Sequence, residues 1–134
     1  MKRKSTVLLV GWNPDVVDYS KWPGLTPEKL KAALEADRAK FEALGYDAEL
    51  GLIDSAETSD LTLRKLLKTK RRDCVLIGAG VRTIPEYLQT FERLLNTFHE
   101  CAPNAKLCFN SGPFDSVDAV QRWVSPSSTN ARAA

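Results

Sequence analysis

The segment that follows the apolar run Cys74–Ile77 combines two glycines with an arginine, a set of groups suited to binding an anion. Gly78 and Gly80 leave their main-chain N–H groups unscreened, because glycine has no side chain. Arg82 adds a guanidinium whose forked donors match a carboxylate or a phosphate. A helix expected to begin near Pro85 would point the positive end of its dipole back at the same loop. The sequence therefore predicts an anion site here.

Two other segments that follow apolar runs offer further groups for a ligand. Gly11, Trp12 and Asn13 come after the first run, and Asn110 and Ser111 come after the fourth. In an open parallel sheet, ligands bind beyond the carboxyl ends of the strands, at the point where the strand order reverses. We therefore expect these residues to line one site together with the glycine–arginine loop. The indole of Trp12 would stack on a planar part of the ligand.

The same residues also have a simpler interpretation. Gly78 and Gly80 would permit a tight turn between a strand and a helix, with Arg82 in solvent. The run Gly78–Thr83 approaches the Gly-x-Gly-x-x-Gly fingerprint of dinucleotide-binding proteins, but a threonine replaces the third glycine. Only one helix follows the next strand, so an NAD site is the less favoured interpretation. The aromatic residues of the long Trp12–Leu25 segment would likewise pack on a neighbouring helix as a small cluster.

The sequence assigns no catalytic residue. Ser111 would need a histidine as its base, but His99 lies near the end of an expected helix, at the opposite edge of the sheet. The loop carboxylates of Asp15, Asp18 and Asp54 remain as acid–base candidates, although such residues more often cap turns. With one histidine and no closely spaced cysteine pair, a zinc site lacks its ligands, and no metal is expected.

Alternation of strand and helix patterns predicts the fold that must position these residues. Thr26 and Pro27 are typical of a helix start and Gly45 of a helix end, and three further helices are expected around 61–68, 85–101 and 116–124. Strands alternating with helices form a parallel sheet covered on both faces. We expect a small doubly wound α/β fold, flavodoxin-like or Rossmann-like, with four parallel strands in the order 2-1-3-4. The expected strands are Val7–Val10, Ala48–Ile53, Cys74–Ile77 and Lys106–Phe109.

Length and composition indicate one domain. The chain has 134 residues, of which 43% are hydrophobic, enough to fill one core. We expect that domain to span residues 1–124. Residues 125–134 have no periodicity and few apolar groups, so a disordered tail is expected there.

The net charge, the lengths of the apolar runs and the cysteine content limit the kinds of partner and the cellular setting that we expect. The chain has 19 basic and 17 acidic residues, too near balance to predict nucleic acid as a partner. No apolar run approaches the roughly 18 residues of a membrane-spanning helix, so no membrane partner is expected. Three cysteines without a Cys-x-x-Cys unit indicate a reducing, cytoplasmic setting.

Two hypotheses of function follow. The first is a cytoplasmic domain that binds an anionic small molecule, phosphorylated or nucleotide-like, at the carboxyl edge of the sheet, with the cofactor and reaction left unassigned. The second is a non-catalytic interaction module that forms a homodimer. In that case the apolar side chains of Leu107 and Phe109, on an expected edge strand, would contact the second copy.

Overall fold

Four parallel strands form the central sheet of the protein, in the order β3-β2-β4-β5. The structure is a computed structural model that describes residues 2–112 and 114–129. The order along this sheet is the predicted 2-1-3-4, and the small doubly wound α/β fold is confirmed. The strands are β2 (Thr6–Trp12), β3 (Asp47–Ile53), β4 (Cys74–Ile77) and β5 (Lys106–Phe109).

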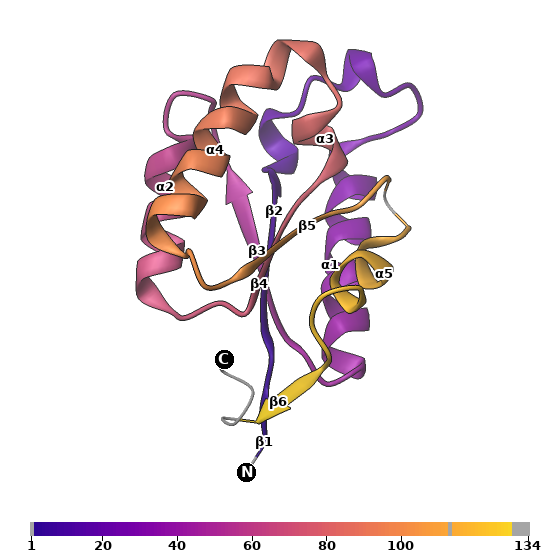
Figure 1. Cartoon of the computed structure of the whole chain (residues 1–134). Helices are drawn as coiled ribbons and strands as arrows, with labels where there is room; N and C mark the ends of the chain where they lie inside the picture. Colours follow the sequence, from indigo (N-terminus) through magenta and orange to yellow (C-terminus); the bar gives the residue numbers. More distant parts are fainter. Residues whose placement is uncertain (1, 113, 130–134) are drawn as a thin grey trace.

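Helices cover both faces of this sheet (Figure 1). Val7 and Leu9 of β2 point into a core beneath α1 and α5, while Leu8 and Val10 point into the core on the opposite side, beneath α2 and α4. All four side chains are buried, which explains why this strand is an unbroken apolar run. The helices are α1 (Pro27–Ala43), α5 (Ser116–Gln121), α2 (Ser59–Thr69) and α4 (Leu88–Cys101). Within the described residues, none of the helices has the length and apolar character needed to cross a bilayer.

The connection between β4 and α4 differs from the expected single helix beginning near Pro85. A one-turn helix, α3 (Ala79–Arg82), directly follows β4, and a 3-10 turn at Pro85–Tyr87 precedes α4. The break has a local cause. Ile84 adopts an extended conformation, as the residue before a proline generally does, so the chain cannot continue as a helix.

The two ends of the described chain form a small antiparallel ribbon. Strand β1 (Lys2–Lys4) pairs with β6 (Ser127–Thr129), and the main-chain N–H of Ser5 donates to the oxygen of Pro126 at 2.9 Å. The expectation of a disordered tail from residue 125 is therefore wrong for residues 125–129. Residues 130–134 lie outside the described part of the chain. The ribbon consists of polar, three-residue strands whose pairing has no local sequence signal.

Candidate functional site

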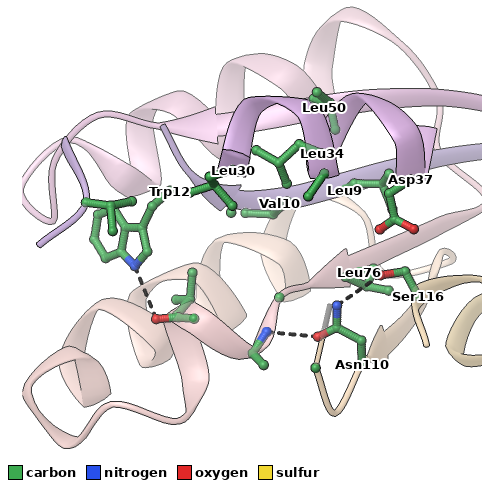
Figure 2. Close-up of a pocket in the computed structure, with 18 of the residues that line it drawn as sticks. Leu9, Val10, Trp12, Leu30, Leu34, Asp37, Leu50, Leu76, Asn110 and Ser116 are labelled. Carbon is green, nitrogen blue, oxygen red and sulfur yellow. Dashed lines mark hydrogen bonds between the residues drawn. The ribbon is translucent and has the colours of Figure 1, made fainter. Parts of the chain in front are cut away.

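Helix α1 lies close against the sheet only in its C-terminal half. Phe41 is fully buried and contacts Tyr46, whereas Leu30 and Leu34, nearer the start of the helix, are only partly buried. A cavity of about 440 Å³ lies between this first half of α1 and the sheet (Figure 2). This volume is in the range of small-molecule sites, and the cavity extends to the carboxyl edge of the sheet, where the topology predicts binding.

The walls of this main cavity are mostly apolar. Leu9, Leu50 and Leu76 form its floor on the sheet, and Leu30 and Leu34 face them from α1. Burying the apolar surface of a ligand against such walls stabilises the complex by roughly 25 cal/mol per Å² removed from water.

The loop between β2 and α1 closes one end of the main cavity. Val17 and Trp22 of this loop line it, together with Trp12 at the end of β2. The indole N–H of Trp12 donates to the main-chain oxygen of Gly80 at 3.3 Å, and its ring packs on Tyr87 with the ring centroids 4.9 Å apart. These contacts hold the indole against α3 and Tyr87, so that its orientation is set by the fold.

A polar cluster occupies the other end of the main cavity (Figure 2). The side-chain oxygen of Asn110 accepts the N–H of Ala79 at 2.8 Å, and its amide nitrogen donates to the Ser116 hydroxyl at 3.0 Å. The carboxylate of Asp37 projects from α1 toward Ser116. Burial raises the pKa of Asp37, and a hydrogen bond from Ser116 partly opposes that rise. The main cavity therefore contains one orientated carboxylate at the end of an apolar chamber.

A second, smaller cavity of about 250 Å³ adjoins the main one. Trp12, Val17, Trp22 and Gly80 line both cavities. The walls of this second cavity, called the outer cavity below, also include Tyr87 and three acidic residues, Asp18, Asp54 and Glu57. A hydrogen bond from Ser20 lowers the pKa of Asp18, which stays ionised at neutral pH.

Six of the eight residues predicted for the binding site line the main cavity: Gly11, Trp12, Gly78, Gly80, Asn110 and Ser111. Asn13 lies outside it. The side-chain amide of Asn13 donates to Asp54 at 2.9 Å, and its oxygen accepts the N–H of Asp15, so it shapes the loop that follows Trp12. The convergence of loops from β2, β4 and β5 at one site is thus as the topology predicts.

Arg82 does not reach either cavity, which corrects its predicted role as the anion ligand. Its guanidinium donates to the main-chain oxygens of Ile77, at 3.2 Å, and of Asn110, and it lies 5.0 Å from the centre of the Phe109 ring. Desolvation of this partly buried group lowers its pKa. The helix dipole expected at this loop lies further along the chain, because α4 begins at Leu88. The N–H of Ala79 is also not free to bind an anion, because it donates to Asn110.

The residues of the site that were not predicted include Leu34, Asp37 and Ser116. The signal for Asp37 is its position, since it occurs at helical spacing on the same face as Leu30, Leu34 and Phe41. An acid on the apolar face of a helix is unusual and calls for a partner or a function. The sequence pattern does not reveal that the first half of α1 stands away from the sheet.

The described residues give no support to a nucleophile or a metal centre. Ser111 donates to Asp115 at 2.6 Å, and His99 lies in the last turn of α4. The thiols of Cys74 and Cys108 are 3.3 Å apart but buried in the core. Within residues 2–112 and 114–129, no three His, Cys, Asp or Glu side chains gather as metal ligands.

Comparison of the sequence with models of known protein families and with curated proteins gives no match. The function is therefore argued from the cavities themselves.

Proposed function

We propose that this protein binds a small molecule with an apolar body in the main cavity, between the first half of α1 and the sheet. The observation that carries the proposal is the cavity of about 440 Å³ with leucines on facing walls. The cavity extends to the carboxyl ends of β2 and β4, the region in which sheets of this topology bind ligands. No reaction is assigned to the site.

The proposed ligand differs in charge from the anion that the sequence suggests. Arg82 is held by main-chain oxygens of Ile77 and Asn110, away from the cavity. Among the described lining residues of the main cavity, the charged side chain is the carboxylate of Asp37. An anion would be repelled by this carboxylate, so an anionic ligand is no longer proposed.

Binding can be tested with N-phenyl-1-naphthylamine, a fluorescent apolar probe that is uncharged at neutral pH. Its fluorescence should rise on titration with the protein, because the apolar walls exclude water from the dye. Leu34→Trp, which fills the chamber from α1, should weaken binding by at least about tenfold, or 1.4 kcal/mol.

Leu61→Trp is the matched control, because Leu61 is 62% exposed on α2, on the opposite face of the sheet. It should leave the affinity for the probe unchanged. Equal affinities in the Leu34→Trp variant and the original protein, both folded by circular dichroism, would show that the probe binds elsewhere and would refute the proposal.

A further inference from the structure

The two adjoining cavities carry charge of one sign. Asp37 lines the main cavity, and Asp18, Asp54 and Glu57 line the outer one. Lysine, arginine and histidine are absent from the described lining of both. Clefts with low-dielectric walls focus such a field, so the carboxylates together favour a cationic ligand.

Asp37 is the carboxylate that lines the apolar main cavity (Figure 2). The ion pairs of α1 join Lys31 to Asp15 and Arg38 to Glu35 and Glu42, and Asp37 takes part in none of them. An ionised carboxylate at an apolar wall loses solvation that a hydroxyl such as that of Ser116 only partly replaces. A cation brought by the ligand would supply the missing partner.

Aromatic rings stand where a ligand would pass between the two cavities. Trp12 and Trp22 line both of them, and Tyr87 packs on Trp12 in the outer one. The faces of indole and phenol rings attract cations. Two of the outer carboxylates are held in place, Asp54 by Asn13 and Asp18 by Ser20, so the negative charge beside the rings is fixed in position.

From these contacts we propose that the ligand is a protonated organic amine, whose apolar body fills the main cavity and whose ammonium group pairs with Asp37. This inference rests on the proposed function and adds the chemical class of the ligand. The ammonium would donate hydrogen bonds to the Asp37 carboxylate. A series of hydrogen bonds, from Ala79 through Asn110 and Ser116, orientates this carboxylate. The aromatic rings and outer carboxylates would favour the approach of the cation.

Three probes with the same apolar chain separate charge from apolarity: octylamine, octanol and octanoate. Each is titrated into the protein with bound N-phenyl-1-naphthylamine, and displacement of the dye gives its affinity. At about pH 7, octylamine should bind at least about tenfold more tightly than octanol, because a partly buried ion pair adds more than a neutral hydrogen bond. Octanoate should bind most weakly of the three.

Asp37→Asn keeps the shape of the side chain and removes its charge. In this variant octylamine should bind within about threefold of octanol, and octanol should bind as it does to the original protein. Unchanged octanol binding also reports that the cavity is intact. Glu92→Gln, the same change at an exposed position on α4, should preserve the full preference for octylamine.

The outcomes distinguish this inference from the function on which it rests. Binding of the dye with equal affinities for octylamine and octanol would overturn the amine and leave the apolar site standing. So would a preference for octylamine that survives in Asp37→Asn, or a dye that octylamine does not displace. A dye that does not bind at all would overturn the proposed function, and the amine with it.

Discussion

The guanidinium of Arg82 donates a hydrogen bond to the main-chain oxygen of Asn110, at the end of the neighbouring strand. The same guanidinium donates to Ile77, the last residue of β4, and lies against the ring of Phe109 in β5. One side chain therefore fastens the carboxyl ends of β4 and β5 to each other. Because Asn110 also lines the main cavity, Arg82 supports the site from outside it.

Arg82→Ala should lower the free energy of unfolding by about 1.5 to 3 kcal/mol, because it removes hydrogen bonds from a charged group and leaves two carbonyls without that donor. Urea denaturation measures the change. Lys65→Ala, at an exposed position on α2, removes the same charge and should cost less than about 0.5 kcal/mol. Equal losses in the two variants would show that Arg82 has no structural role.

Asp73 should make the protein sensitive to acid. Burial alone would raise the pKa of its carboxyl, but hydrogen bonds from Arg3, at 2.7 and 2.8 Å, and from Thr6 outweigh burial and lower that pKa to about 2. Since the pKa is lower in the folded state, the stabilisation is complete above the unfolded value of 3.8 and is lost as the pH falls toward 2.

Each unit by which folding lowers a pKa corresponds to about 1.4 kcal/mol. Acid should therefore remove roughly 2 kcal/mol of unfolding free energy through Asp73. Asp73→Asn should lose that part of the pH dependence, as measured by urea denaturation at a series of pH values. Glu92→Gln, which removes an exposed carboxylate, should retain it. An unchanged acid limb in Asp73→Asn would mean that other carboxyl groups control the transition.

Truncating a side chain should lower the free energy of unfolding more in strand β4, which is closely packed, than in the first half of α1, which is not. Ile77, in β4, is fully buried, so Ile77→Ala should cost about 2 to 5 kcal/mol of unfolding free energy. Leu34, in α1, is only partly buried at the cavity wall, and Leu34→Ala should cost less than about 1.5 kcal/mol. Similar losses at the two positions would mean that the first half of α1 closes onto the sheet in solution.

Binding of octylamine should weaken at low pH. The charged or polar groups around Asp37 are Lys40 on its own helix, and Asp115 and Ser116 at the start of α5. Burial raises the pKa of Asp37, so protonation, which removes the proposed counter-ion, occurs at a higher pH than it would for a solvent-exposed aspartate. Dye displacement from pH 7 downward should show octylamine affinity falling and octanol affinity constant. A fall of the same size in Asp37→Asn would contradict this account.

The predicted homodimer through β5 can be tested by sedimentation. Leu107 and Phe109 pack within their own chain, Phe109 against Phe91 with ring centroids 5.8 Å apart, and Arg122 donates to the main-chain oxygen of Phe109 at 3.1 Å. Because these contacts already engage the apolar side chains and a main-chain oxygen of β5 to which a second copy would bind, we expect a monomer. A dimer at micromolar concentration that Arg122→Ala strengthens would show that the edge does pair.

Local signals in the sequence were sufficient for the sheet and for α1. The unbroken runs of β2 and β4 reflect burial on both faces, and the Thr26 hydroxyl caps α1 by accepting the N–H of Lys29 at 3.1 Å, as its type suggests. Three features depend on contacts between distant residues and have no local signal. They are the partner of Arg82, 28 residues away, the separation of α1 from the sheet, and the pairing of β1 with β6.

That last pairing determines how the molecule would respond to mechanical force. Lys2 lies opposite Thr129 and Lys4 opposite Ser127, so tension applied at Lys2 and Thr129 would pull the two strands apart from their outer end. In this peeling geometry the hydrogen bonds carry the load one after another, and rupture needs little force. The load would then reach the paired hydrogen bonds between Arg3 and Asp73, which connect β1 to the start of β4. The ribbon would therefore come apart and extend before the force stretched the parallel sheet.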